Sequence, residues 1–211
     1  MSLHIKLKNK ARFDEWSKKY DESILQHIVF NISHDMFFRE MSRYVKTGGS
    51  VLDVGCGTGK FAFRMARRYG NMNVHGVDLS EDMIKKAKSK LTEEKIEFKN
   101  GDVEDLPYES NSFDILTCSH SFHHYPNQKK AVSEMHRVLK DDGKLMIIDG
   151  SRDNLLGKVI FGITTIVEGD VYHIFERELR EMMLMVGFDK VMQKKFNPIA
   201  PLLFTLGHAK K

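Results

Sequence analysis

The sequence predicts an α/β fold in which a mainly parallel sheet carries helices on both faces. Short apolar runs with β-branched residues alternate with helix-forming segments from residue 50 onward, which is typical of doubly wound sheets. The first run, residues 50–54, ends in three glycines at alternating positions, Gly55, Gly57 and Gly59. A strand, a glycine turn and a helix in this order open a unit whose backbone can closely approach a nucleotide-like ligand.

The other elements follow from periodicity and from cap and turn residues. Residues 1–11 are expected to form a polar tail, and residues 12–44 show the apolar period of helices, with a break near residues 20–23. Further strands are expected at residues 73–78, 95–99, 113–118, 144–149, 188–196 and 202–209. Helices are expected at residues 61–68, from the N-cap Ser80 onward, and at residues 128–140 and 175–186.

Three connecting segments complete this assignment. Residues 141–143 are expected to be a turn, with Gly143 just beyond the end of a helix. The last two strands are joined through residues 197–198, and so short a connection predicts an antiparallel pair. The apolar stretch 155–167 is expected to be either a core helix or a cover over a hydrophobic substrate.

Composition and charge indicate a protein without a membrane span, a signal peptide or a structural zinc site. The 211 residues carry a formal net charge of +4, and this weak charge permits nucleic acid or acidic lipid as a partner without favouring either. Cys56 and Cys118 lie in separate segments without CxxC spacing, which indicates a reduced, cytoplasmic setting and no structural zinc. We expect neither a signal peptide nor a membrane span, because the sequence has no apolar leader and no 18-residue uncharged apolar run.

Acidic residues stand at the ends of the first three predicted strands. Asp53 precedes the glycine turn, where a carboxylate would repel a pyrophosphate but attract the ammonium of an amino-acid-like group. Asp78 lies 19 residues after Gly59, the place where an acidic residue takes two ribose hydroxyls. Asp102 follows the third strand, where a carboxylate can accept from an exocyclic amine such as that of adenine. Each could also be a turn former or a cap, but together with the turn they indicate a cationic, nucleoside-bearing ligand.

Several motifs resemble those of the class I S-adenosylmethionine-dependent methyltransferases. The matching stretches are VLDVGCGTG at 51–59, VDLSEDM at 77–83, GDVEDLP at 101–107, SFD at 112–114 and EMHRVLKDDG at 134–143. They span roughly half the chain and look most like the small-molecule branch that includes the ubiquinone/menaquinone-biosynthesis C-methyltransferases. FDEWSKKYD at 13–21 resembles the N-terminal lid helix that precedes such a core.

The resemblance implies a particular architecture. It is a Rossmann-like doubly wound seven-stranded sheet in the order 3-2-1-4-5-7-6, with strand 7 antiparallel and with N-terminal lid helices. Residues 1–46 would form the tail and lid, and residues 47–211 the methyltransferase domain, together as one structural unit.

The resemblance also implies S-adenosylmethionine as the cofactor and S-adenosylhomocysteine as its product. The turn and Asp53 would surround the methionyl part, Asp78 would hold the ribose, and the residues after the second and third strands would border the adenine. The implied cofactor-binding residues are Asp53, Gly55, Cys56, Gly57, Gly59, Asp78, Leu79, Met83, Asp102, Val103 and Ser119.

Methyl transfer from a sulfonium is an in-line displacement that depends mainly on alignment, and a base is needed only where the acceptor loses a proton. The catalytic candidates are His123 and His124, which could accept such a proton or could cap and pack the next helix. Their H-x-x-H-H segment also suggests metal ligands, but no cysteine or carboxylate nearby in the sequence completes a set, so we expect no metal. Tyr20 would contact cofactor or substrate if the lid covers the cofactor, and would otherwise be a core aromatic.

The leading hypothesis is therefore an enzyme of the EC 2.1.1 class that methylates a small molecule. An RNA or protein methyltransferase and a non-catalytic cofactor-binding partner subunit remain alternatives. Methylation of base amino groups is disfavoured, because residues 119–122 lack the Asn/Asp-Pro-Pro-aromatic motif of such enzymes. A nicotinamide-dependent dehydrogenase is opposed by Lys60, which stands where its third glycine belongs.

Overall fold

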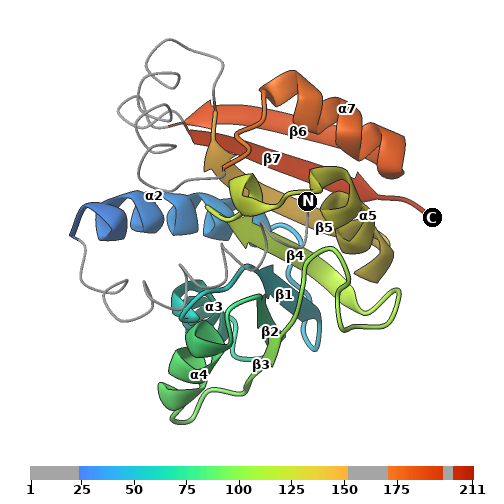
Figure 1. Cartoon of the computed structure of the whole chain (residues 1–211). Coiled ribbons are helices and arrows are strands. Elements are labelled where there is room, and N and C mark those ends of the chain that lie inside the picture. The colour runs from blue at the N-terminus through green and yellow to red at the C-terminus, as the bar shows by residue number, and fades with distance from the viewer. Residues whose placement is uncertain (1–23, 152–170, 197–201) are drawn as a thin grey trace.

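The structure is a computed structural model that describes residues 24–151, 171–196 and 202–211, with side chains from residue 30 onward (Figure 1). The predictions made for Tyr20, for the lid segment 13–21 and for the apolar stretch 155–167 lie outside the described residues.

A seven-stranded sheet in the order β3-β2-β1-β4-β5-β7-β6 forms the centre of the molecule (Figure 1). The strands are β1 Ser50–Val54, β2 Asn73–Asp78, β3 Ile96–Asn100, β4 Phe113–Ser119, β5 Leu139–Gly150, β6 Phe188–Phe196 and β7 Leu202–Ala209. Strands β1 to β5 pair in parallel, whereas β7 is antiparallel to both β5 and β6. The predicted strand order and the antiparallel last pair are confirmed.

Two of the predicted helix ends lie at the expected cap residues. The helices are α2 Ile24–Met41, α3 Lys60–Arg68, α4 Glu81–Ser89, the short 3₁₀ helix η1 Phe122–His124, α5 Gln128–Val138 and α7 Glu176–Val186. Ser80 is the N-cap of α4, since its hydroxyl accepts from the Met83 N–H at 3.1 Å, as predicted. Gly187 terminates α7 with φ 123°, a conformation that favours glycine.

Two apolar clusters lie on opposite faces of the sheet. One gathers side chains of α2, α3 and α4 against the sheet, and the other gathers those of α5 and α7 (Figure 1). Helix α2 belongs to the first cluster, because Met36, Phe37, Phe38 and Met41 are all buried there. Within the described ranges no helix combines the length and apolar character needed to cross a bilayer.

The junction of α5 and β5 differs from the prediction. The helix ends at Val138, two residues early, because Leu139 is extended (φ −69°, ψ 143°) and pairs with Phe113 of β4. Residues 141–143 are therefore not a turn after a helix but part of β5, where the register with β4 shifts and Asp142 has φ 59°. A buried leucine that can join the sheet overrides the helical period at this point.

The strand order places one switch point in the sheet. From β1 the chain moves outward to β2 and β3, then returns to β4 on the other side of β1 and continues to β5. Ligands of open α/β sheets bind beyond the carboxyl ends of the strands at such a point. The segments that follow β1 and β4 are the glycine turn and residues 120–124, so the predicted site segments flank the switch point.

Candidate functional site

The glycine turn after β1 has a backbone that other residues adopt only with strain. Gly55, Gly57 and Gly59 have φ values of 70°, 52° and 79°. A Cβ on Gly55 would lie 2.4 Å from the Ser121 Oγ, and the Gly55 N–H donates to the Val77 carbonyl at 2.8 Å. The turn is therefore held close against both β2 and the segment after β4.

Asp78, at the end of β2, fixes the turn from the other side. Its Oδ2 accepts from the Gly57 N–H at 2.8 Å, and its Oδ1 accepts from the Ser80 N–H at 2.9 Å. Because each carboxylate oxygen can accept two hydrogen bonds, these contacts are compatible with further donors from a sugar. The prediction did not include this structural task of Asp78.

Asp53 is buried at the carboxyl end of β1, with 2% of its surface exposed. Burial raises the pKa of its carboxyl from 3.8 to about 7, and although the Thr117 hydroxyl donates to Oδ1 at 2.9 Å, the negative charge of Asp78 raises it further. A cation bound beside this carboxyl would stabilise its ionised form.

Four other predicted cofactor residues lie on the segments that follow β2 and β3 or in α4. Leu79 and Val103 are half-buried after β2 and β3, and Met83 is buried in α4. Asp102 accepts the Glu104 N–H at 2.9 Å, so it also closes a local turn. Each lies on the segment that its sequence position predicted.

Cys56 and Ser119 differ in what they offer a ligand. Burial raises the pKa of the Cys56 thiol well above its ordinary value, so Cys56 is not a nucleophile at neutral pH. The Ser119 hydroxyl, at the end of β4, is buried and has no hydrogen-bond partner among the described residues. A buried hydroxyl without a hydrogen-bond partner is costly, and a ligand with a polar group can supply the missing partner.

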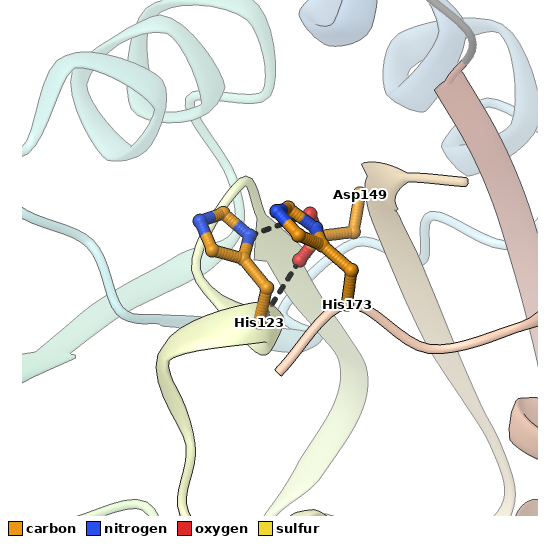
Figure 2. Close-up of side chains that lie close together, drawn as sticks. All are labelled: His123, Asp149 and His173. Carbon is orange, nitrogen blue, oxygen red and sulfur yellow. Dashed lines mark hydrogen bonds and ion pairs between the residues drawn. The ribbon is translucent and has the colours of Figure 1, made fainter. Parts of the chain in front are cut away.

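A histidine and an aspartate meet at the carboxyl ends of β4 and β5 (Figure 2). The Nδ1 of His123 lies 2.6 Å from the Oδ1 of Asp149, and the backbone N–H of His123 donates to Oδ2 at 3.0 Å. The Gly150 N–H also donates to Oδ1 at 2.6 Å. Three donors therefore hold the carboxylate, and the carboxylate fixes the orientation of the imidazole.

Asp149 is ionised despite its burial. Burial alone would raise its pKa, but the charge of His123 and the hydrogen bond that His123 donates bring it well below its ordinary value, with further help from His120 and His173. Asp149 accepts the proton on Nδ1 of His123, so Nε2 is the nitrogen that can accept a proton whenever the ring is neutral.

His173, from segment 171–175 that leads into α7, stacks on His123 with ring centroids 4.8 Å apart and an interplanar angle of 23°. The Tyr172 N–H donates to the His123 carbonyl at 2.6 Å, and the Gln128 amide donates to the Tyr172 carbonyl at 2.6 Å. These bonds fasten the segment to η1 and α5.

The alternative that His123 and His124 cap the next helix is wrong. The N-cap of α5 is Asn127, whose Oδ1 accepts the Lys130 N–H at 3.1 Å, so neither His123 nor His124 caps that helix. A carboxylate and a further imidazole do lie beside His123, since Asp149 and His173 come from distant parts of the sequence. Asp149 could have been predicted as a site residue, because it is the acidic residue at the end of the fifth strand. Nothing in the sequence around His173 indicates that it belongs to the site.

Helix α2 also reaches this edge of the sheet. The Ser33 Oγ lies 2.8 Å from the Nε2 of His120, and the Phe30 ring lies 4.9 Å from that of His120. His120 itself has φ 53°, and its N–H donates to the Ile148 carbonyl at 2.8 Å. The loop after β4 is thus held between β5 and α2.

Comparison with known proteins identifies the family. Residues 52–147 match the family model described as a methyltransferase domain. The demethylmenaquinone methyltransferase of Oceanobacillus iheyensis is 32% identical over an alignment that covers 87% of this chain and 88% of that protein. This chain belongs to the class I S-adenosylmethionine-dependent methyltransferases, in the quinone-biosynthesis branch. The demethylmenaquinone methyltransferase of Listeria monocytogenes is 34% identical over 69% of this chain and 63% of its own length.

Solved structures share the fold of this methyltransferase. A Pyrococcus horikoshii protein has a TM-score of 0.71 at 26% identity, covering 86% of this chain and 91% of its own. The Haemonchus contortus phosphoethanolamine N-methyltransferase 2, solved with S-adenosyl-L-methionine, has a TM-score of 0.72 at 20% identity and covers 84% of this chain and 53% of its own. The cofactor is S-adenosylmethionine. The buried Asp53 carboxyl and the buried Ser119 hydroxyl fit a bound molecule with a cationic and a polar end.

Proposed function

We propose that this methyltransferase acts on a small apolar acceptor of the quinol type and methylates a ring carbon. The observation that carries the proposal is the relationship to a demethylmenaquinone methyltransferase over 87% of the chain. A demethylated quinone becomes the methylated one by gaining a carbon–carbon bond. The site must therefore align a ring carbon with the methyl donor and accept the ring proton that the new bond displaces.

The proposed cofactor contacts follow the arrangement of the turn and strand ends. Asp53 would lie beside the ammonium of the methionyl part, and Asp78 would accept from the ribose hydroxyls. Leu79 and Met83 would border the adenine, and Asp102 with Val103 would meet its amino edge. Ser119 would lie near the sulfonium, and Gly55, Cys56, Gly57 and Gly59 would line the methionyl part. Bound S-adenosylmethionine supplies an electrophilic methyl group on this sulfonium.

His123 is proposed as the proton acceptor, with Asp149 as its positioning residue. The supporting geometry is the 2.6 Å contact between His123 Nδ1 and Asp149 Oδ1, which leaves Nε2 to accept the ring proton. His124, whose ring centroid lies 4.0 Å from that of His123, is proposed as a second substrate contact. Tyr20 stays a candidate contact from the segment outside the described residues.

The proposal is tested by incubating the purified protein with S-adenosylmethionine and a short-chain demethylmenaquinol. The expected product is heavier by one CH₂ unit, with its new methyl group on the ring by NMR, and S-adenosylhomocysteine appears in equal amount. His123→Ala should lower kcat by about 10²–10⁴-fold. A matched control is His208→Gln, because His208 lies in β7 and packs on Tyr44.

The outcomes separate the candidate functions. Methylation of the oxygen instead of the carbon would reject the ring-carbon assignment. Transfer to bulk tRNA or to protein, without transfer to the quinol, would reject the small-molecule acceptor. Equal rates for wild type and His123→Ala would reject His123 as the base.

A further inference from the structure

The side chains of His123, Asp149 and His173 form a cluster that could hold a metal ion. Figure 2 shows the three side chains converging from η1, the end of β5 and the segment before α7. All three are buried, with 6–9% of their surfaces exposed. We propose that they form a binding site for a divalent transition-metal ion, and that metal binding there stops methyl transfer. The second half rests on the proposed role of His123.

The distances suit a metal after small movements. One ligand atom of each residue lies within 4.8 Å of the ligand atoms of the other two. Ligand atoms in a tetrahedral zinc site are about 3.3 Å apart, given bonds of about 2.0–2.1 Å. The contact of 2.6 Å between His123 and Asp149 would open slightly, and His173 would move inward by side-chain rotation.

The donor set selects the kind of ion. Two imidazoles and one carboxylate are typical ligands of zinc, iron and other late first-row divalent ions, and not of magnesium or calcium, which prefer oxygen. Three protein ligands also leave a coordination position for water or another ligand.

Charge favours a cation at this point. Asp149 is a buried carboxylate, and its single ion pair within the described part of the chain is with His123. No lysine or arginine among the described residues pairs with it. A buried carboxylate is costly unless it is paired or coordinates a metal, and an ion would supply a full positive charge.

The backbone already holds the ligands in place. The His123 and Gly150 N–H groups donate to Asp149, and the Tyr172 N–H donates to the His123 carbonyl. The backbones of the three segments are therefore held relative to one another before an ion arrives and only side chains need to move, which lowers the entropy cost of binding.

Metal binding and proton acceptance exclude each other at His123. A neutral imidazole has one N–H and one lone pair. If the metal binds Nδ1, the ring proton must move to Nε2, which can then no longer accept a proton. If the metal binds Nε2, it takes that lone pair directly. In either case the base proposed for methyl transfer is lost.

The first experiment measures Zn²⁺ binding to the full chain without a histidine tag, by titration calorimetry in buffers of different ionisation enthalpy. We expect one equivalent of Zn²⁺, with release of one proton from each ligand imidazole that carried two ring protons before binding. His173→Gln and Asp149→Asn should each weaken binding at least tenfold, while His208→Gln should not. Co²⁺ should give the visible absorption of a four- or five-coordinate nitrogen and oxygen site, and this should be lost in His173→Gln.

The second experiment measures methyl transfer with Zn²⁺ relative to the rate of the same variant in chelator. The wild type should lose most of its activity, and His173→Gln should lose much less. The inference is overturned if the wild type binds no Zn²⁺, or if His173→Gln and Asp149→Asn, folded by circular dichroism, bind it as tightly as wild type. Zn²⁺ binding without loss of methyl transfer would overturn the inference that His123 cannot bind the metal and accept a proton at the same time. Failure of the quinol assay alone would overturn the proposed function and leave Zn²⁺ binding testable.

Discussion

Replacing Asp53 by asparagine should stabilise the cofactor-free protein at pH 8 and weaken its binding of S-adenosylmethionine. Burial raises the pKa of this carboxyl from 3.8 to about 7, so the folded state favours the protonated form. Stability is therefore highest below the unfolded pKa and falls as the pH rises toward the folded pKa. Since one pKa unit corresponds to about 1.4 kcal/mol, ionised Asp53 costs the fold about 4 kcal/mol above pH 7.

Asparagine has nearly the same shape, can still accept from the Thr117 hydroxyl, and never ionises. Between pH 5 and pH 8 the wild type should therefore lose about 3 kcal/mol of unfolding free energy that the variant keeps. Urea unfolding at the two pH values measures this difference. The expected loss in cofactor binding is about 1.5–3 kcal/mol, the contribution of a hydrogen bond to a charged group, and calorimetry measures it.

The same pH dependence in wild type and Asp53→Asn would show that Asp53 is not protonated in the folded protein, and the argument would fail. Unchanged affinity for S-adenosylmethionine would contradict the proposed contact with the ammonium. Asp114→Asn is the matched control for the pH series, because the pKa of Asp114 is lowered and its pH dependence has the opposite sign.

Three further predictions concern the turn and its supports. Gly55→Ala should lower the unfolding free energy measured in urea by about 1–3 kcal/mol, because the added Cβ would collide with Ser121. Gly57→Ala should lower it by less, because no atom lies within 4 Å of a Cβ at that position. Equal losses in the two variants would contradict this reasoning. Asp78→Ala should weaken S-adenosylmethionine binding in calorimetry while a cooperative unfolding transition remains, and unchanged affinity would reject the ribose assignment. Ser80→Ala should lower the unfolding free energy by about 1 kcal/mol through loss of the α4 cap, whereas Ser80→Gly should lower it by only a few tenths.

The sheet could be predicted from the sequence because its signals are local or belong to the motifs. Runs such as residues 145–148 are continuously apolar and lie between glycines at 143 and 150, and Ser80 and Gly187 mark helix ends by their own chemistry. The end of α5 could not be predicted in this way. Leu139 continues the helical period but gains more by pairing with Phe113, a contact that exists only once β4 and β5 are side by side.

The parts of the site that could be predicted are those whose residues lie close together in the sequence. The glycine turn and the aspartates after β1, β2 and β3 stand beside the strands that position them. The contact between His123 and Asp149 spans 26 residues, and it arises because β4 and β5 are neighbours in the sheet. His173 lies beside His123 because the backbone N–H of Tyr172 donates a hydrogen bond to the His123 carbonyl. No pattern of side chains in the sequence predicts that hydrogen bond.

The position of β7 has a consequence for how the chain completes its fold. Strand β6 precedes β7 in the sequence, yet its partner in the described sheet is β7, which separates it from β5. During synthesis β6 is therefore made before its partner strand β7 exists. Helix α7 and β6 must wait, with Val191 and Phe188 still uncovered by the sheet, until residues 202–209 have been made. A ribosome-bound chain that stops before β7 should offer these apolar groups to chaperones, whereas β1 to β5 can already pair.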